Sequence, residues 1–139
     1  MINLNDAVPT DRAHLLVQGH SDDIRLKYTC VTHNAELIHY RDDLIRRIGT
    51  NDRFLALDRH VDRELNAIRA ICQERHGAVV VLDGLDILIT YLRARSPVFA
   101  QLFVKRLWQL RQLEATLWVA LPVALVPGDW PTSRIKQLD

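Results

Sequence analysis

The residues that most constrain the fold are those of the apolar run Ala78–Leu82. Three consecutive valines stand in this run, and no polar residue alternates with them. A strand of this composition must be covered on both faces, which is typical of the interior of a parallel α/β sheet. The run therefore predicts a central strand, with helices packed on both sides of the sheet.

Two acids and a glycine follow this strand: Asp83, Gly84 and Asp86. The carboxyl ends of parallel strands form the edge where α/β folds bind ligands, and in P-loop NTPases an acid at this place holds Mg²⁺. The run thus indicates an NTPase-like core. If no phosphate loop faces it, we expect Asp83 to accept backbone hydrogen bonds or to cap the next turn. We expect Asp86 to lie in the same turn and Gly84 to let the chain bend sharply.

The rest of the chain alternates between predicted strands and predicted helices. Strands are predicted at residues 14–18, 28–32, 53–57, 78–82 and 115–121. Helices are predicted at residues 35–48, 59–76 and 97–113, with a helix or an irregular turn at 85–95. Asn34, Asp58 and Ser96 stand where N-caps are expected.

This order of elements predicts an α/β fold in three layers, in which helices flank both faces of a mainly parallel sheet of about five strands. With 139 residues, the chain has the length of a single domain. We expect its core to span about residues 14–122. Residues 123–139 contain two prolines and a glycine and are predicted to form a tail or an edge element.

Composition favours a soluble, cytoplasmic protein. The net charge of +1 provides no global field for nucleic acid or an anionic membrane. No apolar run has the length of a membrane span, and residues 1–6 lack the features of a signal peptide. Cys30 and Cys72 fall in apolar segments, so we expect buried thiols rather than a disulfide. No pair of histidines has the spacing of a zinc site on one helix, and no metal or cofactor is expected.

A phosphate loop requires glycines, a lysine and an adjacent hydroxyl. After the first predicted strand, Gly19 and Ser21 stand in plausible places. A second glycine and an adjacent Lys-Ser/Thr pair are missing, and Asp22 and Asp23 would repel a triphosphate. The sequence therefore predicts a degenerate Walker A motif, no catalytic residues, and a vestigial nucleotide site formed by Gly19, Ser21, Asp83, Gly84 and Asp86.

Aromatic residues supply candidates for an interface. The arginines are interleaved with acids, which is typical of a solvated face with local ion pairs. Only Tyr40 and Trp108 accompany them, too few for a nucleic-acid groove. Trp130 lies in the proline-flanked tail, where we expect it to dock on a partner or on the sheet edge. The interface candidates are therefore Trp130, Trp108 and Tyr40.

The stretch Ala78–Thr90, the segment Phe99–Leu113 and the apolar run Ala115–Pro122 together resemble an uncharacterised, mainly archaeal KaiC/RecA-like domain. That domain is found beside PAS, receiver and histidine-kinase modules. The resemblance covers about residues 15–122, with residues 30–33 and 54–57 similar to two further strands of the family. One departure is that the family has a helix between its first two strands, whereas only residues 19–27 lie there in this interpretation. His33 stands where the family has an arginine.

A weaker resemblance is to the small P-loop protein of BREX phage defence, which carries a Walker A motif that this chain lacks. These similarities imply a non-catalytic RecA/KaiC-like module that regulates or binds another protein, in signalling or beside an active ATPase. A protein partner or a homo-oligomer is expected. One alternative is a subunit of an ATPase complex with atypical nucleotide binding. Another is a small nucleic-acid-binding adaptor, which would show steeply salt-dependent binding.

Overall fold

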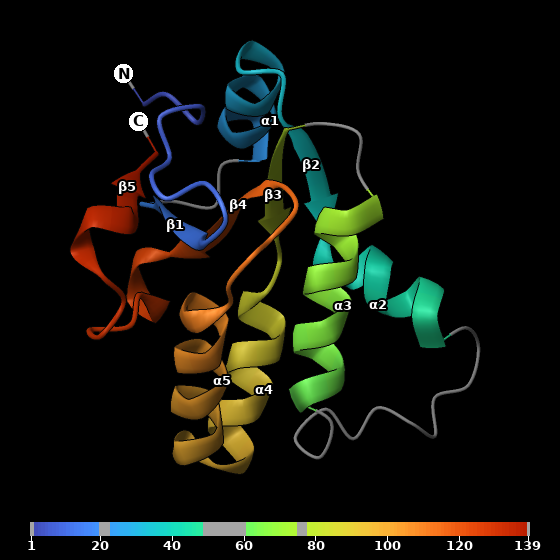
Figure 1. Cartoon of the computed structure of the whole chain (residues 1–139). Helices are drawn as coiled ribbons and strands as arrows, with labels where there is room; N and C mark the ends of the chain where they lie inside the picture. Colours follow the sequence, from blue (N-terminus) through green and yellow to red (C-terminus); the bar gives the residue numbers. More distant parts are fainter. Residues whose placement is uncertain (1, 20–22, 49–60, 75–77, 139) are drawn as a thin grey trace.

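Five parallel strands form one sheet in the order β2-β3-β4-β1-β5 (Figure 1). The computed structural model of the chain describes residues 2–19, 23–48, 61–74 and 78–138. In chain order the strands are β1 Ala13–Gln18, β2 Glu36–His39, β3 Val79–Asp83, β4 Thr116–Pro122 and β5 Ile135–Gln137. The helices are α1 Asp23–Thr32, α2 Tyr40–Ile48, α3 Val61–Glu74, α4 Asp86–Arg95 and α5 Pro97–Gln109, and two short 3₁₀ turns span Val123–Leu125 and Thr132–Arg134. The predicted α/β fold with a parallel sheet is confirmed.

Handedness decides which face each helix covers. The chain crosses from β1 to the far edge at β2 and then returns through β3 to β4. Because parallel crossovers are right-handed, reversing the direction of travel moves the connecting helices to the opposite face. Accordingly, α1 packs on one face, whereas α2, α3, α4 and α5 pack on the other. Figure 1 shows α1 apart from the layer formed by α3, α4 and α5.

The alternating side chains of the strands divide between two cores. In β3, Val80 and Leu82 face the larger core, while Val79 and Val81 face the core below α1. All four valine and leucine side chains are at most 4% exposed. The predicted central strand at residues 78–82 is therefore confirmed as an interior strand, covered on both faces.

The smaller core lies between the sheet, α1 and the N-terminal segment. Leu26 and Cys30 point inward from α1, and Leu4 closes the core from the N-terminal segment. Trp118 of β4 fills its centre, and its indole N–H donates to the Leu4 carbonyl at 2.9 Å. Next to it, the His14 ring lies 5.0 Å from the Trp118 ring and its Nε2 is 2.8 Å from the Pro9 carbonyl oxygen.

The prediction for residues 28–39 is wrong. Residues 28–32 form the second half of α1, not a strand, and the second strand lies at Glu36–His39, inside the predicted helix. Asn34 does not cap a helix start. It has φ 54° and ends α1, since the N–H groups of Ala35 and Asn34 donate to the Cys30 and Val31 carbonyls. This is the Schellman arrangement, with Asn34 in the left-handed position.

Burial explains this error. Leu26 and Cys30 are buried four residues apart, which is helical spacing, and this packing outweighs the strand propensity of Val31 and Thr32. The expected absence of a helix between the first two strands is corrected as well, because α1 lies there.

Other predictions are confirmed or refined. α3 lies where a helix was predicted, residues 85–95 are largely the helix α4, and the tail supplies the edge strand β5. Ser96 and Pro97 begin α5 as expected, and Phe99 and Leu102 on its outer side are 44% and 43% exposed. The strand predicted at residues 53–57 and the cap at Asp58 lie outside the described residues.

Burial of His14 should make stability depend on pH. Burial, together with the charges of Arg134 and Lys136, lowers the pKa of His14 below its usual 6.5, although the bond to Pro9 opposes this. Folding therefore favours the neutral ring, so its contribution is complete above pH 6.5 and is lost as the pH falls below that value. In urea unfolding, His14→Phe should lose less stability between pH 7 and pH 5 than the wild type, by up to about 1.4 kcal/mol per pH unit. If the free energy of unfolding depended on pH equally in both proteins, the result would contradict this role of His14.

Candidate functional site

The sheet has one point where neighbouring strands send the chain to opposite faces. β1 and β4 are paired in parallel, with Gln18 opposite Pro122. From β1 the chain passes to α1 on one face, and from β4 it passes toward Trp130, which lies in the core on the other face. In open α/β sheets the crevice outside such a pair of strands is the usual ligand site. Gly19, which follows Gln18 directly, therefore lies at this crevice.

Asp83 lies at the same edge but not beside Gly19. β4 stands between β1 and β3, so the two residues are separated by two strand spacings, about 10 Å across the sheet. Asp83 is opposite His39 in the ladder, and its Oδ2 is 3.5 Å from His39 Nδ1. The Asp83 side chain is 18% exposed and that of His39 is 43% exposed. The carboxylate thus has a neighbour that pairs with it whenever His39 is protonated.

The two glycines of the predicted site differ. Gly84 has φ 89°, and a Cβ added there would meet the Tyr40 backbone at 3.8 Å. Gly19 has no such backbone angle, and a Cβ there would touch nothing within 4 Å. The sharp turn expected at Gly84 is therefore present, whereas nothing in the described structure requires glycine at position 19. Asp86 begins α4, where an acid favours the helix dipole, and Ser21 lies outside the described residues.

The contrast between the glycines can be measured. Gly84→Ala should cost about 1–2 kcal/mol of the free energy of unfolding, because a side chain disfavours positive φ even where it has room. Gly19→Ala is the matched control and should change stability by less than about 0.5 kcal/mol. Urea denaturation of both variants tests this, and a Gly84→Ala protein as stable as the wild type would contradict the requirement for glycine at position 84.

A buried ionic network lies beside this edge, and the sequence prediction missed it. Glu64 of α3 is fully buried and receives hydrogen bonds from Tyr40 at 2.5 Å, Arg47 at 2.7 Å and Arg63 at 2.9 Å. Arg47 also donates to Asp43 at 2.7 Å. These bonds join α2 to α3 directly after β2. The spacing of Asp43 and Arg47 by four residues was the one available signal, since it suggests an ion pair on a helix.

The network sets the charges of its members. Burial alone would raise the pKa of Glu64, but hydrogen bonds from Arg47, Tyr40 and Arg63 outweigh it and lower the pKa. Burial and the bond to Glu64 raise the pKa of Tyr40. For Arg47, burial opposes charge, but the bonds to Glu64 and Asp43 raise its pKa. Glu64 is therefore a charged, fully engaged carboxylate that holds two helices together and leaves no free base.

Glu64→Gln should test this structural role. The variant leaves the half-buried Arg47 without full compensation in a contact with the fully buried position 64, so we expect a loss of about 3–5 kcal/mol near neutral pH. Glu74→Gln, on the exposed end of the same helix, is the control and should be almost neutral. Because the folded pKa of Glu64 lies below 4.5, its contribution is complete above that pH and is lost as the pH falls through the folded pKa. The difference in the free energy of unfolding between the wild type and Glu64→Gln should therefore decrease in acid. A difference that stays constant with pH would contradict a charged Glu64 in the folded protein.

The aromatic interface candidates lie inside the protein. Trp130 and Tyr40 are each 1% exposed, and Trp108 is half-buried with the Arg134 guanidinium 5.9 Å from its ring centre. Trp130 therefore packs in the core beside the sheet, which is close to one of its two expected positions, and neither Trp130 nor Tyr40 presents its side chain at the surface of the chain. Cys30 and Cys72 are buried as predicted, and burial raises the pKa of each thiol to about 11, so both are unreactive.

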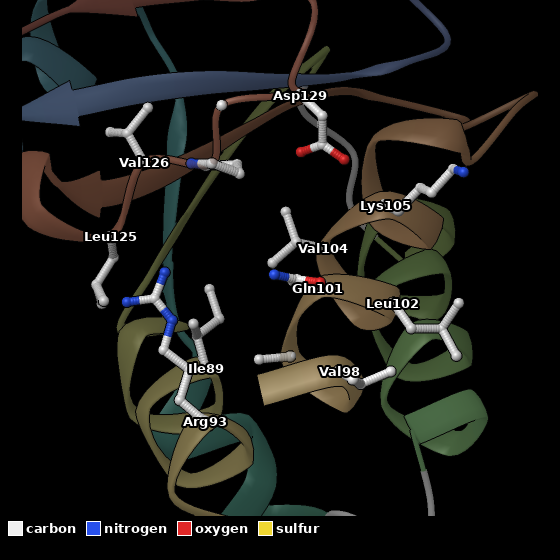
Figure 2. A pocket seen from close by; sticks show the side chains of 13 residues that line it. Ile89, Arg93, Val98, Gln101, Leu102, Val104, Lys105, Leu125, Val126 and Asp129 are labelled. Carbon is white, nitrogen blue, oxygen red and sulfur yellow. The ribbon is translucent and has the colours of Figure 1, made fainter. Parts of the chain in front are cut away.

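Exposed apolar side chains mark two other surfaces. On α1, Ile24, Tyr28 and Val31 are 81%, 69% and 81% exposed and stand about one turn apart. We call these three residues the α1 stripe. On the opposite face of the sheet, a groove opens between α4, α5 and residues 125–129, with Leu102 and Val98 on its rim (Figure 2).

Within the described ranges, no group of three histidine, cysteine or acidic side chains is arranged to hold a metal ion. None of the helices described here has the length and apolar character that a membrane crossing requires. Comparison of the chain with family models, with curated proteins and with solved structures gave no match. The assignment of function therefore depends on the geometry alone.

Proposed function

We propose that the chain is a non-catalytic RecA/KaiC-like module that regulates or binds another protein, in signalling or beside an active ATPase. The order β5-β1-β4-β3-β2 of the parallel sheet supports the RecA-like part of this proposal. In a RecA-like sheet, the strand before the phosphate loop and the strand that carries the acid are separated by one strand, as β1 and β3 are here. One fold can carry many functions, so the function must come from the site.

The site at the carboxyl edge supports a module without NTP hydrolysis. Residues 19–27 contain one glycine, and their one lysine, Lys27, is followed by Tyr28 rather than by a serine or threonine. Hydrolysis also requires charges that are available to the metal and phosphates. Here Asp83 neighbours His39, and the buried Glu64 is engaged by three hydrogen-bond donors. These contacts support a structural role for both carboxylates.

The α1 stripe is the observation that carries the interaction role. Its three side chains point away from Leu26 and Cys30, which face the core on the other side of the helix. A helix of ten residues with apolar side chains on both faces is suited to burial on both faces. Anchors spaced by four and three residues match the way in which proteins recognise an amphipathic helix. We therefore place the contact with a protein partner at α1.

Calorimetry and affinity purification test the two parts of the proposal. ATP and GTP should show no saturable binding at sub-millimolar concentration. From extracts of the native host, the wild-type chain should retain a partner that Tyr28→Glu loses, because a buried charge in an apolar contact is unfavourable. Ile45→Glu, on the exposed side of α2, should retain it. Saturable nucleotide binding would refute the absence of a nucleotide site. Equal capture of the partner by both variants would refute the contact at α1.

An ATPase-complex subunit is the second candidate, and the position of Asp83 favours it. The carboxylate stands at the carboxyl end of an interior strand and is partly exposed. If a partner supplied the phosphate loop, the complex would turn over ATP, and Asp83→Ala would abolish this activity without unfolding the chain. An Asp83→Ala protein that unfolds would instead assign a structural role to this acid.

A further inference from the structure

The groove between α4, α5 and residues 125–129 has a mixed lining. Its volume is about 630 Å³, within the range of small-ligand sites. Ile89 of α4 and Val104 of α5 form an apolar floor, and both are almost fully buried. Three polar side chains, Arg93, Gln101 and Asp129, come from the three segments that surround this floor.

These polar groups are free to bind a ligand. Within the part of the chain that the structure describes, the side chains of Arg93, Gln101 and Asp129 have no hydrogen bond and no ion pair. Figure 2 shows that Arg93 and Asp129 approach the groove from different sides and that Gln101 extends from the α5 wall, whereas Lys105 points away. A cation, an amide and an anion are thus presented around one apolar surface, although Arg93 and Asp129 do not pair with each other.

The chemistry of the lining defines a ligand. An arginine binds a carboxylate through parallel hydrogen bonds, and an aspartate pairs with an ammonium group. A glutamine side chain both donates to and accepts from a peptide group, and the floor favours apolar side chains. A short peptide with free ends carries all of these groups. We propose that this groove binds short peptides with apolar side chains, the carboxylate at Arg93 and the ammonium at Asp129.

The proposal does not depend on the proposed function. No residue of the groove belongs to the carboxyl-edge site or to the α1 stripe, which lies on the opposite face of the sheet. A terminus of a larger protein would present only one of the two charges. A fatty acid would leave Asp129 without a partner. Peptides with blocked ends therefore distinguish these sources from a free peptide.

Isothermal titration of the full chain with the tripeptide leucyl-alanyl-leucine is the first test. The free peptide should bind saturably at sub-millimolar concentration. The N-acetylated and the C-amidated forms should each bind roughly tenfold more weakly, because each loses one charge-assisted contact. No saturable binding, or equal affinity of the three peptides, would overturn the proposal. Full affinity of one blocked form would also overturn it and indicate a protein terminus instead.

Variants then assign each end of the peptide. Arg93→Gln should remove the difference between the free and the amidated peptide but keep the effect of acetylation. Asp129→Asn should remove the difference between the free and the acetylated peptide but keep the effect of amidation. Each variant is therefore the control for the other. Arg95→Gln is a further control, because Arg95 lies on the same helix with its guanidinium 5.4 Å from the Tyr91 ring centre and does not line the groove. If Arg93→Gln and Asp129→Asn still distinguish the free from the blocked peptides as the wild type does, the assignment of the two peptide ends is refuted. If a variant fails to fold, the blocked peptides still test the proposal on the wild-type chain.

Discussion

The reversal of strand order between β1 and β4 is the constraint on which the rest of the structure depends. All strand pairs are parallel, so each connection must cross over with the same hand. The step from β1 to β2 runs one way across the sheet and all later steps run the other way. Among the helices that the structure describes, α1 therefore covers one face by itself, while α2, α3, α4 and α5 share the other. The crevice at β1 and β4, the lone α1 and the groove beside α5 all result from this arrangement.

Charged side chains stabilise the structure near the carboxyl edge of the sheet. Glu64 is removed from water completely, and its cost of desolvation is compensated by the three donors that surround it. Asp83 lies opposite His39 rather than a phosphate loop. Both acids therefore have partners within the chain.

The two surfaces we assign to binding differ in character. The α1 stripe is apolar and convex, which suits a macromolecular partner that can bury it. The groove is concave and combines an apolar floor with unpaired charges, which suits a small amphipathic ligand. Because they lie on opposite faces of the sheet, a partner on α1 leaves the groove open. A module of this kind could hold a protein and a ligand at the same time.

Local sequence was sufficient to predict an element wherever the residues of that element showed a clear apolar pattern or turn signal. The valine run of β3 could only be an interior strand, α3 has a single apolar face, and Gly84 stands where the strand must turn. It was insufficient at residues 28–39, because α1 is apolar on both faces and β2 is a short, half-buried edge strand, so neither shows a clear period. Glu64, Arg93 and Asp129 could not be recognised as site residues in advance. Their roles arise from groups that are distant in the chain, and only the packing of α3 on α2, or of residues 125–129 beside α4 and α5, brings those groups together.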